Sequence, residues 1–250
     1  MKNLEYGLVS IITPSYNSSK YIHETIKSVL SQTYMNWEMI IVDDFSTDNS
    51  ISIIQKVLLT DSRIKLIKLI RNVGPAIARN KAIEVASGRY IAFLDSDDLW
   101  HKDKLEKQLK FMNQKDIHFT FSSYNIIDKN GKKIGFFETK KTVDYYDLLK
   151  TNSIGCLTAI YNSEVLGKIF MPVISKRQDL GLWLRILKLL NQAHGITEPL
   201  ASYRILDGSV SSNKIDSALY QWKIYRDVEK LGFFRSVYYF IHYTYYGWKK

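Results

Sequence analysis

The chain has 250 residues, of which 46% are hydrophobic, so it can bury the core of one large α/β domain or two small ones, and a disordered protein is excluded. The single cysteine, Cys156, excludes an intramolecular disulfide, and residues 1–5 lack the basic and apolar stretches of a signal peptide, so we expect a cytoplasmic protein. The net charge of +10 favours an acidic partner: nucleic acid, an anionic membrane or a phosphorylated small molecule.

The first hundred residues alternate between short apolar runs and stretches in which apolar residues recur with helical spacing. We expect strands at 8–13, 39–42, 64–70 and 90–94, and helices at 21–30, 48–58 and 76–86. This alternation predicts an α/β fold with a mostly parallel central sheet and helices on both faces.

Polar clusters follow three of these strands, at residues 13–17, 43–44 and 95–98. Ligands of open α/β sheets bind beyond the carboxyl ends of the strands. The sequence therefore predicts that the three clusters meet at one binding site.

Residues 95–98 place three carboxylates within four positions, directly after a buried strand. Carboxylates this close repel one another, which makes most sense if a hard cation, Mg²⁺ or Mn²⁺, lies between them and a ligand. The alternative is that these residues cap a helix that starts near Trp100, and we expect Asp98 to act as this cap. No glycine-rich phosphate loop occurs, so the nucleotide-binding motifs of Rossmann dehydrogenases and P-loop nucleoside triphosphatases are missing.

The alternation is lost after a helix at 104–112. We expect strands within 117–127, a hairpin turn at 129–132, a short helix at 145–149, an apolar helix at 180–190 and a strand at 200–205 followed by a polar turn at 207–209. Asp179 stands at the start of the apolar helix, where an acid is also an ordinary first-turn residue. Arg204 could bind either a pyrophosphate or a surface acid.

The tail from 233 to 248 is rich in aromatic residues, with Arg235, His242 and Lys249 recurring every seven residues. As a helix it would span roughly 24 Å, too short and too rich in tyrosine for a transmembrane segment. We expect a peripheral contact with an anionic membrane surface, aided by Lys249 and Lys250; packing on the core and an oligomer contact are the alternatives.

These residues resemble glycosyltransferase family 2, a large family of inverting enzymes with a GT-A fold. The resemblance rests on motifs that occur in the family's order at 9–17 (VSIITPSYN), 31–34 (SQTY), 41–48 (IVDDFSTD), 72–80 (NVGPA, then ARN) and 90–98 (YIAFLDSDD). It is clear over residues 8 to about 112 and weaker through Asp179 and Arg204. With the loss of alternation after residue 116, we expect a nucleotide-sugar-binding half at 1–116, a mixed acceptor-side half at 117–212 and a helical aromatic and basic extension at 213–250, which lies outside the resemblance.

The resemblance also implies roles for single residues. Asp97 matches the metal ligand of the D-x-D motif, and Asp44 matches an acid that hydrogen-bonds uracil. The remaining donor-binding positions that it implies are Thr13, Pro14, Tyr16, Arg79, Asp95, Ser96 and, more weakly, Arg204. A divalent ion there would neutralise the charge that develops on a departing nucleoside diphosphate.

Inversion in a single displacement needs a base that takes the proton of the acceptor hydroxyl. Asp179 matches the aspartate of the Glu-Asp pair that the family places before an apolar helix with a tryptophan, here Trp183. The chain departs from the pattern at Gln178, which stands where the family has the glutamate. Any role of that glutamate would fall to a neutral amide.

We therefore predict a metal-dependent glycosyltransferase that moves a sugar, from a UDP-sugar, to a glycan acceptor of bacterial surface polysaccharide or lipooligosaccharide synthesis. The acceptor could be lipid-linked, which would suit a cytoplasmic protein peripheral to the inner face of the membrane. Two alternatives stay open: a nucleotidyltransferase-like enzyme and a noncatalytic protein that binds anionic lipid or nucleic acid. Residues 13–20 lack the glycines of the first, and no basic helix with interleaved aromatics supports nucleic-acid binding.

Overall fold

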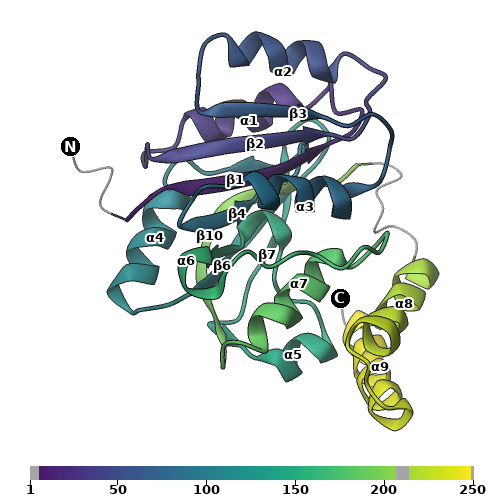
Figure 1. The fold of residues 1–250 in the computed structure, drawn as a ribbon. Coiled ribbons are helices and arrows are strands. Elements are labelled where there is room, and N and C mark those ends of the chain that lie inside the picture. The colour runs from purple at the N-terminus through teal and green to yellow at the C-terminus, as the bar shows by residue number, and fades with distance from the viewer. Residues whose placement is uncertain (1–5, 207–213, 249–250) are drawn as a thin grey trace.

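The computed structural model describes residues 6–206 and 214–248 (Figure 1). The turn expected at 207–209, and Lys249 and Lys250 of the expected membrane contact, lie outside these residues. The described strands form one sheet in the order β3-β2-β1-β4-β9-β6-β10-β5, with β7 added beside β6 and β8 beside β10.

The first half of the sheet is parallel, as the alternation predicts. It consists of β3 (Ile64–Lys68), β2 (Trp37–Asp43), β1 (Val9–Ser15) and β4 (Tyr90–Phe93). The connecting helices are α1 (Ile22–Leu30), α2 (Ser50–Leu58) and α3 (Pro75–Val85). The strand expected at 64–70 ends earlier, at Lys68, and Ile70 is 91% exposed because the chain has left the sheet there.

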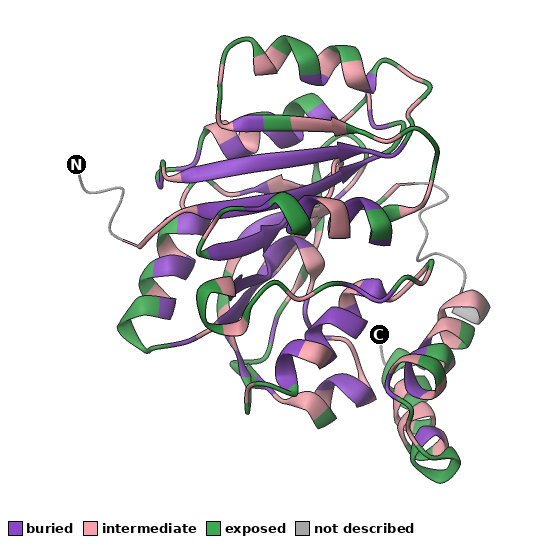
Figure 2. Cartoon of the chain, viewed as in Figure 1, coloured by how far each residue is buried: buried purple, intermediate pink, exposed green. Residues whose placement is uncertain are grey.

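Helices cover both faces of the sheet, which confirms the predicted layering. Alternate strand residues point to opposite faces, so Ile11 and Ile41 pack with α1, α2 and α4, while Ile12 and Val42 pack in a second cluster with α3, α5 and α7. The strands β1, β2 and β4 are buried throughout (Figure 2). Strands buried on both faces form a stiff platform for the residues at their ends.

The second half is mixed in strand direction. Its strands are β5 (Leu99–Trp100), β6 (Phe119–Ile127), β7 (Lys133–Phe137), β8 (Thr142–Val143), β9 (Ile160–Asn162) and β10 (Ala193–Arg204), and its helical segments are α4 (Lys104–Gln114), α5 (Tyr145–Lys150), η1 (Cys156–Thr158), α6 (Ser163–Leu166) and α7 (Gln178–Leu187). Because β9 runs antiparallel to both β4 and β6, it joins the two halves into one sheet. The predicted hairpin turn lies between β6 and β7.

The expectation that Asp98 caps a helix near Trp100 is wrong. Leu99 and Trp100 form β5, which pairs with β10, and α4 begins only at Lys104 after its N-cap residue Asp103. The buried carboxylate of Asp98 instead accepts a hydrogen bond of 2.8 Å from the backbone N–H of Arg204. Asp98 therefore ties the acidic segment to β10.

The described tail forms α8 (Lys214–Lys223), a π-helical turn η2 (Ile224–Val228) and α9 (Phe233–Trp248). Helix α9 packs against α5, α8 and η2, so the alternative of packing on the core holds for one of its faces (Figure 1). None of the described helices is long and apolar enough to cross a membrane.

Candidate active site

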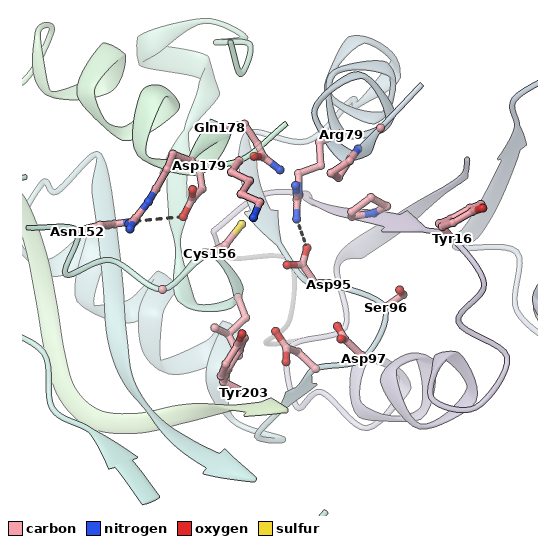
Figure 3. Close-up of a pocket in the computed structure, with 18 of the residues that line it drawn as sticks. Tyr16, Arg79, Asp95, Ser96, Asp97, Asn152, Cys156, Gln178, Asp179 and Tyr203 are labelled. Atoms are coloured by element: carbon pink, nitrogen blue, oxygen red, sulfur yellow. Dashed lines mark hydrogen bonds and ion pairs between the residues drawn. The ribbon is translucent and has the colours of Figure 1, made fainter. Parts of the chain in front are cut away.

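A cavity of about 820 Å³ opens beyond the carboxyl ends of β1, β2 and β4, where the three polar clusters were expected to meet. Eight of the predicted site residues line it: Pro14, Tyr16, Asp44, Arg79, Asp95, Ser96, Asp97 and Asp179. Figure 3 shows Tyr16 and Ser96 on one side, Asp179 and Asn152 on the other, and Asp95 and Cys156 between them. Residues more than 160 positions apart thus share one site.

Asp44 holds the loop that leads into α3. Its two carboxylate oxygens accept hydrogen bonds of 2.8 Å from the backbone N–H groups of Val73 and Gly74. Gly74 has φ of 89°, a conformation that favours glycine, and Pro75 then opens the helix. The carboxylate reaches the cavity while it fixes the wall that carries Arg79.

Arg79 and Asp95 form an ion pair of 2.5 Å across the cavity floor. Burial lowers the pKa of Arg79, but the charge of Asp95, the hydrogen bond to it and the more distant Cys156 and Asp179 together outweigh burial and raise the pKa above its ordinary value. Arg79 is only 6% exposed, and its Nε and Nη1 are buried with no hydrogen-bond partner among the described residues. Buried N–H groups without partners are costly, so this guanidinium is suited to an anionic ligand.

In the acidic segment, the charged forms of Asp97 and Asp98 are disfavoured. Burial, then the negative charge of Asp95, raises the pKa of Asp97 to about 6. Burial, then the charges of Asp97 and Asp95, raises the pKa of Asp98 well above its ordinary value. A cation at the cavity-lining carboxylate of Asp97 would relieve this repulsion.

Asp179 faces this acidic segment from the second half of the chain. It lies in the first turn of α7, and its Oδ2 accepts a hydrogen bond of 3.2 Å from the side-chain amide of Asn152 (Figure 3). Arg177, which precedes the helix, has φ of 64°, unusual for a residue with a side chain. Gln178, at the departure from the family pattern, also lines the cavity.

Thr13 and Arg204 are not among the residues that line the cavity. Thr13 is fully buried within β1. The guanidinium of Arg204 donates hydrogen bonds to the backbone oxygens of Asp97 and Lys129 and forms an ion pair of 2.7 Å with Glu24. This geometry favours the alternative of an acid partner for Arg204 over a pyrophosphate.

A family model described as Glycosyl transferase family 2 matches residues 10–170. The chain belongs to glycosyltransferase family 2. The resemblance carried by the sequence motifs is thereby confirmed, and the nucleotidyltransferase-like and noncatalytic alternatives are set aside.

Similar proteins agree with this membership. The chain is 48% identical over 238 residues to TuaG of Bacillus subtilis (strain 168), named as a candidate teichuronic acid biosynthesis glycosyltransferase, covering 95% of this chain and 94% of TuaG. It is 42% identical over 245 residues to WfgD of Escherichia coli, named UDP-Glc:alpha-D-GlcNAc-diphosphoundecaprenol beta-1,3-glucosyltransferase. The match covers 97% of this chain and 94% of WfgD. The solved structure of S. aureus TarS 1-349 in complex with UDP-GlcNAc matches with a TM-score of 0.73 at 23% identity, over 94% of this chain and 71% of that one, which confirms the GT-A type of fold.

The side chains of this glycosyltransferase could supply only some of the ligands of a divalent cation. Among the residues that the structure describes, no three His, Cys, Asp or Glu side chains are arranged to hold a metal. Asp97 offers a hard carboxylate in the cavity, and the phosphate oxygens of a donor are ligands of the same kind. The residues present therefore fit an ion that binds together with the nucleotide.

Several residues that line the cavity of this glycosyltransferase were missed in the sequence: Tyr124, Phe137, Asn152, Lys176, Arg177 and Tyr203. A signal existed for two of them, because a hairpin centred on the turn at 129–132 pairs Tyr124 with Phe137. Asn152 and Lys176 lie in loops without a motif, so only the folded chain identifies them.

Proposed function

We propose that this glycosyltransferase moves a hexose from a UDP-sugar to a hydroxyl of a lipid-linked glycan in the synthesis of a bacterial surface polysaccharide. Asp179 serves as the base, and Asp97 holds a Mn²⁺ or Mg²⁺ ion with the donor. The observation that carries the proposal is that one cavity has Arg79 and the acidic segment on one side and Asp179 on the other.

The donor would lie along the side that Pro14, Tyr16 and Asp44 form. The unpartnered Nε and Nη1 of Arg79 would donate to its diphosphate oxygens, while Asp95 keeps the guanidinium in place. A bound divalent ion would supply neutralisation of the charge that the departing UDP acquires.

The acceptor would approach from the side of Asp179. The carboxylate takes the proton of the acceptor hydroxyl, the hydroxyl oxygen forms a bond to the anomeric carbon, and the bond from that carbon to the diphosphate breaks, leaving its electron pair on UDP. Attack from the face opposite to the leaving group inverts the configuration. The amide of Asn152, 3.2 Å from Asp179, would hold the carboxylate towards the acceptor.

The choice of substrates follows from the relatives. WfgD, 42% identical over nearly its whole length, is named for UDP-Glc and for GlcNAc linked to diphosphoundecaprenol. TarS, which shares the fold, was solved with UDP-GlcNAc. We extend this to a UDP-hexose donor and to a sugar on a lipid diphosphate as acceptor.

Helix α9 would bring the enzyme to the membrane that carries such an acceptor. Phe234, Tyr238, Ile241 and Tyr245 follow helical spacing on its exposed face, opposite to the packed residues Tyr239 and Tyr243, and Phe234 is 87% exposed. Arg235 flanks this stripe, and the chain carries a net charge of +10. An apolar stripe beside basic charge suits the headgroup region of an anionic leaflet.

Release of UDP from a panel of UDP-sugars, first alone and then with octyl α-GlcNAc diphosphate, tests the proposal. We expect slow hydrolysis of one donor with Mn²⁺ or Mg²⁺, a strong increase with the acceptor, and loss of both in Asp97→Asn. Asp116→Asn, at an exposed acid whose positive φ asparagine tolerates, is the matched control and should behave as the wild type. Turnover that persists with a chelator would contradict the role of the ion.

A further inference from the structure

Three aromatic residues lie side by side at the cavity wall. Tyr124 of β6 pairs directly with Phe137 of β7, and it also pairs with Ala201 of β10, so that Tyr203 lies two positions further along β10. Because strand residues alternate between faces, all three side chains are on the same face of the sheet. Each is partly exposed and lines the cavity.

The three rings support one another. The rings of Tyr124 and Phe137 are stacked, with centroids 4.8 Å apart and an angle of 13° between their planes. The ring of Tyr203 meets Tyr124 edge-on at 6.1 Å. Both are favourable aromatic geometries, so the three rings form a preformed surface. Binding of a ligand to it would cost little side-chain conformational entropy.

Gly155 fixes the position of this surface. A Cβ atom at Gly155 would lie 2.8 Å from Cε1 of Tyr124, so only glycine allows the loop to pack this closely on the ring. The same loop contains Asn152, the hydrogen-bond partner of Asp179. The aromatic surface and the proposed base are therefore held by one segment.

The cluster lines the same cavity as the acidic segment and Asp179. Figure 3 shows Tyr203, like Asp179, on the opposite side of Asp95 from Tyr16. Tyr16, by contrast, lies on the far side of the cavity from Asp179 (Figure 3). The surface thus adjoins the space that an attacking hydroxyl must occupy, away from the side proposed for the nucleotide.

We propose that Tyr124, Phe137 and Tyr203 form the subsite that binds the acceptor sugar. This inference rests on the proposed function and adds a residue-level site for its acceptor. A pyranose ring has an apolar face of C–H groups that packs on aromatic rings, and hydroxyls at its rim that hydrogen-bond to phenol groups. Packing on this surface would orient one acceptor hydroxyl towards Asp179.

Binding of octyl α-pyranosides of glucose, GlcNAc, galactose and GalNAc to the UDP-loaded protein, measured by saturation-transfer NMR, tests the subsite without turnover. We expect the dissociation constant of the best pyranoside to rise about tenfold in Tyr203→Leu and Phe137→Leu, and less in Tyr203→Phe, with UDP binding unchanged. Gly155→Ala should weaken pyranoside binding because it displaces Tyr124. Phe136→Leu is the matched control, since this neighbour of Phe137 is exposed on the opposite face of β7.

Equal pyranoside binding in the leucine variants, a parallel loss of UDP binding, or no pyranoside binding by the wild type would each overturn the assignment. Failure of the subsite is distinct from failure of the proposed function, because UDP release from a UDP-sugar without acceptor reports only on the donor side.

Discussion

Arg177, which directly precedes the helix that carries Asp179, donates a hydrogen bond of 2.7 Å to the hydroxyl of Tyr243 in α9. The guanidinium also lies 5.2 Å from the centre of the Tyr243 ring, within cation–π range. The helix proposed to contact the membrane therefore contacts the turn that positions the proposed base. Arg177 itself is the N-cap residue of α7 and has a left-handed backbone conformation.

Tyr243→Phe should impair the positioning of Asp179 without unfolding the protein, because it removes one partly buried hydrogen bond of about 1 kcal/mol and keeps the ring. We expect kcat of transfer to fall by about three- to tenfold, while acceptor-free UDP release and Tm change little. Tyr238→Phe, on the exposed face of the same helix, should match the wild type. A lower Tm with unchanged kcat would indicate a role in packing alone.

Asp179→Asn should reduce transfer by about 10² or more, the scale of general-base catalysis, because an amide cannot take the acceptor proton. Donor affinity, measured by calorimetry with the UDP-sugar, should stay close to that of the wild type. Glu84→Gln, an exposed acid on α3, is the control. Retained transfer would remove Asp179 from the mechanism.

The stripe on α9 should determine membrane binding. Phe234→Ser combined with Ile241→Ser should reduce sedimentation with anionic vesicles, because both side chains are exposed and contribute apolar area. Higher salt should weaken the binding of the wild type through screening. Leu59→Ser, at the exposed end of α2, serves as control, and equal sedimentation of all three proteins would contradict the membrane contact.

The buried ammonium of Lys104 should lower the free energy of unfolding at neutral pH. Its ammonium is fully buried beside Trp100, with the neutral amide of Gln108 as hydrogen-bond acceptor, and burial lowers its pKa well below the ordinary value. The unfolded chain therefore holds this proton more tightly than the folded one, so the free energy of unfolding should rise with pH up to the unfolded pKa.

Lys104→Met should raise the free energy of unfolding at pH 7 by about 1 kcal/mol and flatten its rise between pH 7 and 9.5. Urea unfolding at the two pH values measures both effects. The exposed Lys110→Met on the same helix is the control. A variant less stable than the wild type at pH 7 would mean that the contacts of the ammonium outweigh its desolvation.

The first half of the fold could be predicted because its signals are local. Apolar runs of strand length and helical stripes alternate up to Phe93, and three of the four strands end in polar clusters, so a parallel sheet with ligands at these ends follows from general rules of βαβ connections. The second half lacks this regularity. Its strands β5 and β9 have two and three residues, too short for periodicity to indicate them, and their pairing with distant strands is what defines them.

Asp98 and Arg204 show why the partners of single residues could not be predicted from the sequence. Both looked functional or local in the sequence, yet the carboxylate of Asp98 binds the backbone of Arg204, and the guanidinium of Arg204 binds Glu24, 180 positions away. Such partners depend on which strands pair, which no local pattern encodes.

By itself, the sequence determined the family, the parallel half of the sheet and the acids at its strand ends, because local periodicity and motif order depend only on neighbouring residues. The tertiary structure alone decided that Asp179 and Asn152 face Asp95 and Arg79, and that Tyr124, Phe137 and Tyr203 form one surface beside them. These arrangements join strands and loops that are distant along the chain, and they depend on long-range strand pairing and packing that no local pattern encodes.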